Sequence, residues 1–297
     1  MVVEQVLVAT MVLTTPILLA AMGGLVNRQA GIVNIGLEAK MLSGAFVAVI
    51  VSSATGSWAL ACLAAAFVGG SIGWLFSLTI TRVGANMIVA GLGLNVLVAG
   101  VIGFLLAWVY ASSGTLRLPD VALLPSVLPD SIATLPLIGP LLAEMDPLTL
   151  LAWATVFALP VLLAKTRIGL WIRATGNASH VTRAVGLLPK TIQDVSTIFA
   201  GAYSGLAGAH LALATLGLFN EGLTAGRGFI ALAAFYFGRD RPIATALACL
   251  LFGFLDATQI RLQTAGLPPK LIGMTPYVMV LVALVVTSIQ AQRREKR

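Results

Sequence analysis

Long, continuously apolar segments divide the chain, and this pattern constrains the fold more than any other feature of the sequence. A membrane-crossing helix needs about 17–25 mostly apolar residues to cover roughly 30 Å of hydrocarbon. The candidate segments are Gln5–Val26, Gly31–Ser52, Trp58–Thr81, Asn86–Tyr110, Pro147–Ala164, Thr191–Leu216, Leu223–Gly238, Pro242–Leu262 and Leu271–Gln290. They predict an all-α polytopic membrane protein with about nine transmembrane helices, eight or ten being the alternatives.

The composition supports this fold class and excludes others. Of 297 residues, 59% are hydrophobic and only 10% are charged, against about 45–50% and about 25% in a soluble domain. Such a chain cannot cover a water-facing surface, which excludes a soluble enzyme, a disordered tail and a coiled coil. The strands of a transmembrane barrel would alternate polar and apolar residues, and these segments do not. We expect a single transmembrane domain over residues 1–297.

The few charged residues are distributed unevenly, and this predicts the orientation. The net charge is +7, which in a membrane protein indicates the positive-inside bias rather than nucleic-acid binding. With nine crossings and a cytoplasmic C-terminus, the N-terminus is external. The basic residues that then fall inside are Arg28, Arg82, Lys165, Arg167, Arg173, Arg183, Lys190, Arg239, Arg241, Arg293, Arg294, Lys296 and Arg297. Those that fall outside are Arg117, Arg227, Arg261 and Lys270.

Two connecting loops differ from the rest. For the external loop 111–146, rich in Pro and Leu, a lid, an interfacial helix beneath a docking partner and a plain connector all stay open. The cytoplasmic loop 165–190 carries five basic residues and no acidic one. Gly176 and Gly186 flank a stretch around Asn177–Val185 that predicts a short helix across the membrane surface. Such a helix either binds the membrane surface or receives a partner.

A short internal similarity predicts an inverted repeat. Gly24–Asn27 (GLVN) is similar to Gly217–Asn220 (GLFN), each at the end of a long span and each followed by a glycine-bounded segment. The predicted topology puts the two copies at opposite faces, as an inverted repeat requires. The half-repeats cover roughly residues 5–110 and 191–290.

The seventh segment is shorter than the others and begins among the glycines Gly222, Gly226 and Gly228. Glycine weakens a helix and permits backbone conformations closed to other residues. We therefore expect a broken or partly re-entrant helix here.

Motifs for catalysis are missing from the sequence, which has no GxxxxGK[ST] phosphate loop and no HExxH. Gly69–Gly73 matches GxSxG by letter, but it lies within a span, where small residues let helices approach closely. We expect the same packing role for Gly201–Gly208. Cys62 and Cys249 lie in apolar segments and are expected to be packing residues. The protein is therefore not expected to be an enzyme or to hold a metal, and no catalytic residue is assigned.

Charged and polar residues inside spans are costly in lipid and are therefore candidates for function. Glu38 and Asp256 are the strongest, with Glu38 near the cytoplasmic third of the second span. Lys40, two residues further, does not face Glu38 on a helix. The uncharged candidates are Asn34, Asn86, Asn95, Asn220, Thr258 and Gln259. For each of these polar residues an ordinary hydrogen bond between helices is the alternative.

Three blocks of sequence resemble signatures of ATP-binding-cassette (ABC) importer permeases in the branched-chain amino acid and ribose permease superfamily. GIVNIGLE at Gly31–Glu38 is similar to a G-x-x-N-I-G-x-E segment typical of the nucleoside and simple-sugar branch. GLWIRATGN at Gly169–Asn177 resembles the cytoplasmic coupling loop, and GRGFIALAA at Gly226–Ala234 the late glycine-rich segment. The blocks follow the family's order, and the resemblance spans roughly residues 20–262.

The resemblance implies a permease that moves nucleosides or simple sugars inward by alternating access. The chain itself would hold no cofactor, because ATP and Mg²⁺ are bound by a separate ATPase subunit. The other implied partners are a second permease subunit (a heterodimer), a substrate-binding protein or lipoprotein, and membrane lipid. The implied location is the bacterial plasma (inner) membrane. The ATPase would dock on the coupling loop, at Arg173, Gly176, Asn177, Arg183, Ala184 and Gly186.

The expected translocation pathway includes Asn34, Glu38, Asn86, Asn95, Asn220, Phe229 and Asp256. The chain departs from its branch after Glu38, where Ala39 and Lys40 replace Gly and an uncharged residue. A cation here either changes the charge of the pathway or extends to the cytoplasmic interface. Purine or pyrimidine nucleosides, pentoses and hexoses therefore stay open as substrates. An ion-coupled secondary transporter without an ATPase also stays open, with Glu38 or Asp256 carrying the ion.

Overall fold

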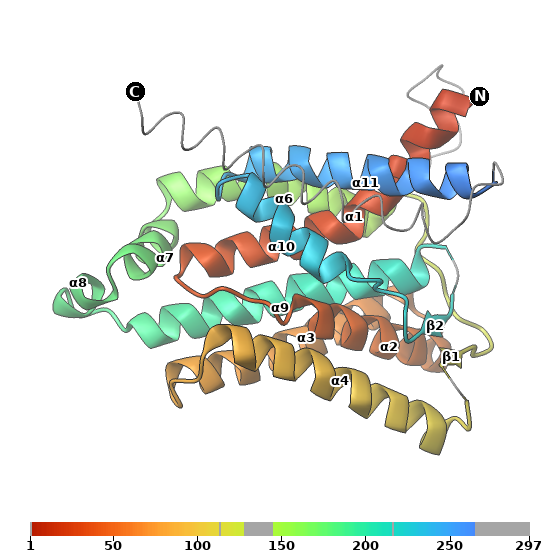
Figure 1. Cartoon of the computed structure of the whole chain (residues 1–297), viewed down its shortest axis with the longest axis horizontal. Coiled ribbons are helices and arrows are strands. Elements are labelled where there is room, and N and C mark those ends of the chain that lie inside the picture. Colours follow the sequence, from red (N-terminus) through yellow and green to blue (C-terminus); the bar gives the residue numbers. More distant parts are fainter. Residues whose placement is uncertain (1, 113, 128–144, 216, 265–297) are drawn as a thin grey trace.

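The structure is a computed structural model that describes residues 2–112, 114–127, 145–215 and 217–264. Over these ranges it is a bundle of helices with one small two-stranded ribbon (Figure 1). In chain order the elements are α1 (Val2–Gln29), α2 (Leu37–Thr55), α3 (Trp58–Thr81), α4 (Met87–Val109), β1 (Thr115–Leu116), α6 (Pro147–Lys165), α7 (Arg167–Asn177), α8 (Ser179–Ala184), α9 (Pro189–Leu213), β2 (Phe219–Asn220), α10 (Arg227–Phe237) and α11 (Pro242–Thr264).

Polar residues begin several helices by accepting from backbone N–H groups that have no partner inside the helix. Ser57 caps α3, and Asn86 caps α4. Asp146 caps α6, whose first residue is Pro147, a position where proline loses no hydrogen bond. A capping residue followed by an apolar run thus accounts for the start of each of these helices.

Most of the predicted spans are confirmed, and the chain is a polytopic all-α membrane protein. Six described helices are long and apolar enough to cross a membrane, namely α1, α2, α3, α4, α6 and α11. In the place of the sixth predicted span, α9 is a helix of 25 residues. In the place of the seventh, α10 has 11 residues, about 16 Å and roughly half of the hydrocarbon thickness, which agrees with a broken helix. The ninth predicted span, Leu271–Gln290, lies outside the described residues.

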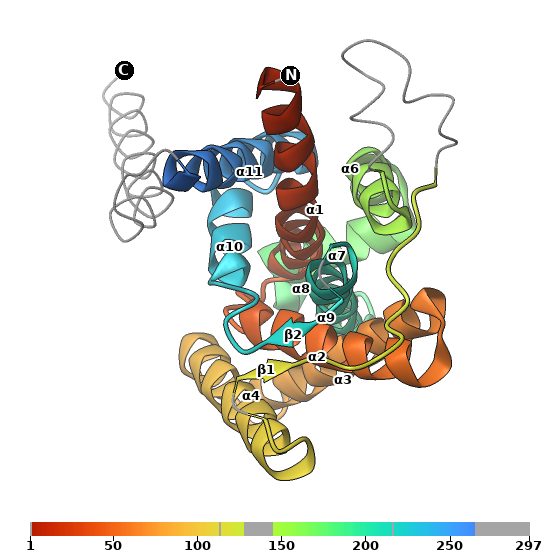
Figure 2. The same ribbon diagram turned by 90° about the vertical axis from the view of Figure 1, so that its right-hand side faces the viewer.

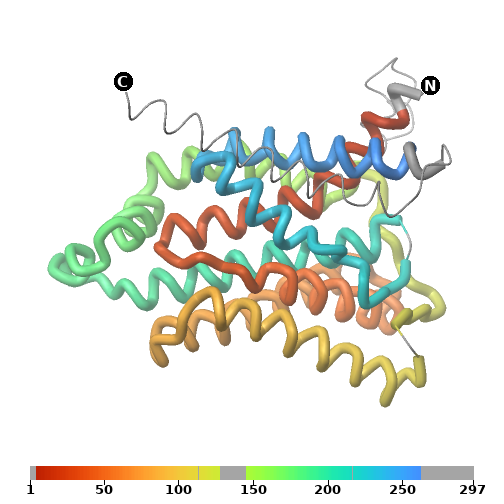
Figure 3. Tube along the Cα trace, in the orientation of Figure 1, coloured from red at the N-terminus to blue at the C-terminus, as the bar shows by residue number. Residues whose placement is uncertain are grey.

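The second span begins later than predicted. Residues 31–36 are not helical, and α2 begins at Leu37 rather than Gly31. The chain leaves α1 through a turn at Gly31, whose φ of 87° suits glycine. Glu38 therefore lies in the first turn of α2 rather than two turns into a helix, and Figure 3 shows α2 starting near the middle of the bundle.

The centre of the bundle is α9, which packs against α2 and α3 through small residues. A Cβ added at Gly201 would collide with the carbonyl oxygen of Gly69, and one at Gly205 with that of Ala65. The hydroxyl of Ser71 donates to a carbonyl of its own helix. The packing role predicted for the GxSxG match and for the glycines of α9 is therefore confirmed. The two cysteines are also buried and free.

The bundle has two chemically different ends. The ends of α1, α3, α6 and α10 gather with α7 and α8 (Figure 1); because Arg28, Arg82, Lys165 and Arg239 lie at these helix ends, we call this the basic end. The antiparallel ribbon β1–β2 lies at the opposite end, the ribbon end, on the side where the N-terminus lies (Figures 1 and 2). This separation follows the predicted charge asymmetry.

Candidate translocation site

Two helices start inside the bundle, and Glu38 joins their N-termini. Its Oε1 accepts the N–H of Gly226 at 2.9 Å, and its Oε2 accepts the N–H of Gly228 at 2.7 Å. From this point α2 runs toward the ribbon end and α10 toward the basic end (Figure 3). The carboxylate thus lies at the positive ends of two helix dipoles, which favour an anion. We call Glu38, Gly226 and Gly228 the junction.

The glycines of the junction are required by backbone geometry. Gly226 has a φ of 76°, in the left-handed region. A Cβ added at Gly228 would lie 2.6 Å from the backbone nitrogen of Glu38 and 2.7 Å from its carboxylate. A side chain at position 228 would therefore push α2 and α10 apart. These two contacts explain the glycines that the sequence places around the seventh segment.

A buried cation lies beside the junction. Lys40 is fully buried; its Nζ donates to Oδ1 of Asn34 at 2.6 Å and lies 4.4 Å from the centre of the Phe76 ring. The interpretation that Lys40 extends to the cytoplasmic interface is therefore wrong. Asn34, in the non-helical segment before α2, is fully buried as well, and its Nδ2 has no partner among the described residues.

Asn95 of α4 holds the start of α2. Its Oδ1 accepts the N–H of Ala39 at 3.0 Å, and its Nδ2 donates to the carbonyl of Ile35 at 3.2 Å. The residue before α2, Gly36, has no side chain to cap the helix. Asn95 therefore satisfies one of the open N–H groups of the first turn from a neighbouring helix.

The start of α10 carries a second charged pair. Nη2 of Arg227 lies 3.4 Å from Oδ2 of Asp256 on α11, and both side chains are largely buried. Asp256 thus has the partner that a carboxylate within a span needs, although the sequence indicated an external Arg227. Phe229, one residue after the junction, is 41% exposed.

Two of the predicted pathway residues lie apart from the junction. Asn86 is exposed at the start of α4, where its side chain caps the helix. Asn220 lies in β2 at the ribbon end, and its Nδ2 donates to Oγ1 of Thr115 at 2.8 Å. Both amides serve local backbone or ribbon structure. The structure therefore brings Asn34, Glu38 and Asn95 together, with Phe229 and Asp256 on adjoining turns, and leaves these two outside.

The predicted coupling loop contains two short helices rather than one. Gly176 and Asn177 are the last residues of α7. The short helix predicted around Asn177–Val185 is confirmed by α8, which spans Ser179–Ala184 and begins two residues later than that stretch. Gly186 follows α8 with a φ of 82°. The reason is local: the backbone at Ala178, with φ −155° and ψ 79°, is not helical and separates the two helices.

The surface of α8 is exposed although part of it is apolar. Arg183 and Ala184 are exposed, as are Val181 and Val185, the latter by 69%. Arg173 on α7 is only half-buried. Because α8 lies at the tip of the basic end (Figure 1), this surface is open to a partner.

Gly176 connects α7 to the break before α2. A Cβ added there would collide with the carbonyl oxygen of Gln29 and lie 2.9 Å from the nitrogen of Gly31. From α9, Nε2 of Gln193 donates to the carbonyl of Ala30 at 3.2 Å. The turn that leads into α2 is therefore in contact with both α7 and α9.

Two carboxyl groups outside the spans have shifted pKa values. Burial raises the pKa of Asp240, and the guanidinium of Arg28, 2.8 Å away, offsets this only in part. Burial also raises the pKa of Asp146, but the hydrogen bond and charge of His210 and the bonds from Thr149 outweigh it, so this pKa is lowered. The Asp146–His210 contact ties α6 to α9.

Sequence reasoning missed the glycine N–H donors at 226 and 228 and the bond between Lys40 and Asn34. The available signal was the position of Glu38 just after Gly36, because a carboxylate is favoured on the first turn of a helix. Nothing in the sequence pairs the two helix starts. Among the described residues, no three His, Cys, Asp or Glu side chains form a group that could hold a metal ion.

Comparison with known proteins adds to this geometry. A family model described as "Branched-chain amino acid transport system / permease component" matches residues 6–286. "Nucleoside ABC transporter permease protein NupC" of Lactococcus lactis is 30% identical over 300 residues, covering 94% of this chain and 91% of that protein. "Guanosine ABC transporter permease protein NupQ" of Bacillus subtilis is 29% identical over 289 residues, with 93% and 89% covered.

A sugar-transport relative is about as similar. "Putative glucose ABC transporter permease protein TsgC13" of Haloferax volcanii is 30% identical over 260 residues, covering 87% of this chain and 78% of that protein. No solved structure gives a significant match. The family model, which matches residues 6–286, spans the junction and both short helices of the basic end.

Proposed function

Since this chain belongs to the family of permease components of branched-chain amino acid transport systems, we propose that it is the permease subunit of an ABC importer for nucleosides or simple sugars. The names of its relatives support both substrate classes. The junction carries the proposal, because transporters commonly bind their substrates where broken helices meet near the middle of the membrane.

The substrate would bind beside the junction. A carboxylate accepts hydrogen bonds from hydroxyl groups, and an exposed aromatic ring stacks on a base or packs on a sugar. Glu38 and Phe229 offer these two contacts within two turns of broken helix. In the described conformation Glu38 is occupied by the N–H groups of α10. Separation of α2 from α10 would free its oxygens for the hydroxyl groups of the substrate.

The basic end would receive the ATPase subunit, which brings its own ATP and Mg²⁺. The exposed apolar side chains of α8 suit a protein partner. Movement of α8 would pass to α7 and, through the contact of Gly176 with Gln29 and Gly31, to the turn before α2. This route connects the docking surface to Glu38 and would drive alternating access.

The pairing of helices supports the inverted repeat. α3 packs on α9, and α11 packs on α1; α2 also contacts α9, and α10 contacts α1. If α1, α2 and α3 are matched with α9, α10 and α11, the contact of α3 with α9 corresponds to that of α11 with α1, and the contact of α2 with α9 to that of α10 with α1. The matched helices run in opposite directions (Figure 1). The proposal includes a ninth helix as the counterpart of α4 and a single permease domain. It also places the protein in a bacterial inner membrane, with the basic end and the C-terminus in the cytoplasm.

Two further partners complete the proposed importer. A binding protein or lipoprotein would deliver the substrate to the ribbon end. A second permease subunit would complete the pathway as a heterodimer. Only 11% of the membrane-crossing stretch of α4 is buried, the smallest share among the six helices that could cross a membrane. α4 therefore has a free face for lipid or for that subunit.

The proposal is tested by purifying the chain with its ATPase and measuring uptake in vesicles. We expect Val185→Asp to remove the ATPase from the purified complex. Val83→Asp is the matched control, because Val83 is also strongly exposed but lies at the end of α3. ATPase loss with both variants, or with neither, contradicts docking on α8. A thermal-shift screen of the binding protein with nucleosides, pentoses and hexoses then identifies the substrate.

The ion-coupled alternative makes the opposite prediction. Uptake by this chain alone, driven by a proton or sodium gradient without ATPase or ATP, would overturn the importer. No contact in the described structure favours that alternative, since Glu38 and Asp256 both have partners within the protein.

A further inference from the structure

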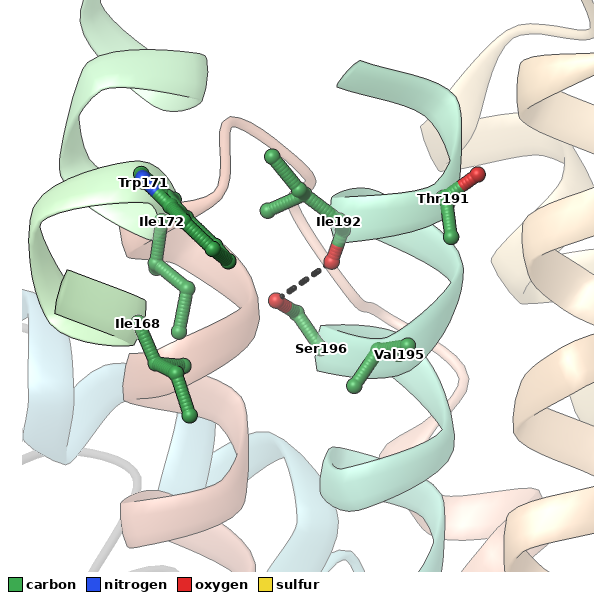
Figure 4. Close-up of a pocket in the computed structure, with 7 residues that line it drawn as sticks. All are labelled: Ile168, Trp171, Ile172, Thr191, Ile192, Val195 and Ser196. Carbon is green, nitrogen blue, oxygen red and sulfur yellow. Dashed lines mark hydrogen bonds between the residues drawn. The ribbon is translucent and has the colours of Figure 1, made fainter. Parts of the chain in front are cut away.

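An apolar groove of about 260 Å³ lies between α7 and α9 at the basic end. The residues that line it are Ile168, Trp171 and Ile172 from α7 and Thr191, Ile192, Val195 and Ser196 from α9, with the hydroxyl of Thr191 on the side away from α7 (Figure 4). Figure 4 shows the two sets of side chains facing each other across the gap. Ile168, Trp171 and Val195 are exposed, so the groove opens to the outside of the bundle.

The groove offers almost no hydrogen-bonding group to an occupant. The hydroxyl of Ser196 donates to the carbonyl of Ile192 at 2.8 Å and is therefore turned back onto its own helix (Figure 4). The indole nitrogen of Trp171 lies on the side of its ring away from α9 (Figure 4). Any occupant must therefore be apolar where it enters the groove.

Two exposed basic residues lie next to the lining residues in the sequence. Arg167 precedes Ile168 on α7, Lys190 precedes the first lining turn of α9, and both are exposed. No acidic residue lies between 165 and 190. The nearest carboxylate along α9, Asp194, is held by Arg82 at 2.7 Å. Exposed basic residues on the two helices that form an apolar groove are complementary to a molecule with an apolar tail and an anionic head.

A single acyl chain is much thinner than an α-helix, which is about 10 Å wide with its side chains. Tryptophan next to Lys and Arg is also typical of the membrane–water interface, where lipid headgroups lie.

We propose that this groove binds an anionic phospholipid, with one acyl chain between α7 and α9 and its phosphate contacting Arg167 and Lys190. The acyl chain moves from lipid into an equally apolar groove, so it gains little preference by doing so. The headgroup therefore determines which lipid binds. Because the groove adjoins α7, the bound lipid becomes part of the surface between the coupling helices and α9. The proposal is independent of which substrate the protein transports.

Trp171 provides the test. The importer complex is prepared with Trp58, Trp74, Trp108 and Trp153 replaced by Phe, so that Trp171 is the fluorescent group in this chain. It is reconstituted with brominated phosphatidylglycerol or brominated phosphatidylcholine, since bromine on an acyl chain quenches a tryptophan in contact with it. We expect phosphatidylglycerol to quench at a mole fraction at least fivefold lower. Partner tryptophans are subtracted with a Trp171→Phe complex.

Charge variants separate headgroup binding from simple exposure to lipid. Arg167→Gln and Lys190→Gln should each weaken phosphatidylglycerol binding roughly fivefold, and together remove the preference over phosphatidylcholine. Arg239→Gln is the matched control, because it removes one exposed basic residue of the same end from another part of the chain, and it should change nothing.

Three results would overturn the proposal. Equal quenching by the two lipids would mean that the groove has no headgroup preference. Lack of quenching by either lipid in the assembled importer would mean that protein covers the groove. An equal effect of Arg239→Gln would reduce the preference to the overall charge of the basic end. If the fourfold Phe variant does not fold, the difference in quenching between the native and Trp171→Phe complexes gives the same readout.

Discussion

The starts of α2 and α10 are alike in geometry and opposite in chemistry. Each helix begins inside the bundle after a non-helical segment. The long helix before α2 is α1, which runs toward the basic end, and the long helix before α10 is α9, which runs toward the ribbon end (Figure 1). The start of α2 supplies side chains, with Glu38 and Lys40 in its first turns and Asn34 before them. The start of α10 supplies bare backbone N–H groups from two glycines.

This difference makes the two halves complementary rather than equivalent. Two negative side chains facing each other would repel, and two uncapped helix starts would leave buried N–H groups without partners. The single carboxylate of Glu38, which accepts from the N–H groups of two glycines, avoids both costs. The proposed repeat would thus form an asymmetric site, in which one half carries the charge and the other provides space for it.

Loss of the charge at the junction should have the largest effect. Glu38→Gln replaces one acceptor oxygen with an NH₂ group that cannot accept from a backbone N–H. Hydrogen bonds to a charged group contribute about 1.5–3 kcal/mol, so we expect uptake by the importer in vesicles to fall about tenfold or more. Glu221→Gln, at an exposed carboxylate of the ribbon end, should leave uptake unchanged. Native-like uptake by Glu38→Gln would show that the junction is only structural.

The next largest effect should come from filling the space on the α10 side. Gly228→Ala places a methyl group 2.6 Å from the nitrogen of Glu38, and overpacking of this kind costs about 1–3 kcal/mol. We expect a lower melting temperature of the purified complex and uptake reduced several-fold. Gly100→Ala, on α4 with nothing near the added carbon, should stabilise slightly because alanine favours a helix. Equal melting temperatures for the two variants would contradict the close approach.

Much of the fold could be predicted from the sequence because single helices are local. The apolar runs and capping residues predict α3, α4 and α6 within a few residues, and glycine spacing predicts the packing of α9. The start of α2 could not be predicted in this way. Residues 31–36 are largely apolar but not helical, and the residues that contact this segment and the turn before it, Asn95, Gly176 and Gln193, lie far away in the chain.

The sequence names residues of the candidate site but not their arrangement. Glu38 and Asp256 can be identified from the sequence because a charged side chain within a membrane span is costly and therefore rare. Their partners are glycine N–H groups at 226 and 228 and the side chain of Arg227, and only the fold brings these together. Asn86 and Asn220 belong to the same residue type as Asn95, yet their amides serve a helix cap and a ribbon. Residue type alone did not separate these roles.

A smaller effect is expected from the cation that distinguishes the α2 side. Lys40→Met keeps the length of the side chain and removes the charge and the bond to Asn34. Because burying a charge is costly, we expect the melting temperature to stay within about 2 °C or to rise, while loss of one hydrogen bond of about 1 kcal/mol reduces uptake roughly fivefold at most. Arg239→Met, at an exposed basic residue, is the control for uptake. A large loss of thermal stability would show that Lys40 holds the fold together.

The smallest effect should come from the charged pair on the α10 side. Arg227 and Asp256 are both largely buried, but their contact of 3.4 Å is long for a charged pair, so a double-mutant cycle with Arg227→Gln and Asp256→Asn should give a coupling of about 1 kcal/mol in stability. Uptake by Asp256→Asn should stay within about twofold of native, because this carboxylate fastens α10 to α11 and carries no ion. A collapse of uptake at native stability would move the functional charge from α2 to α10, and the ion-coupled mechanism would then gain the support that it lacks.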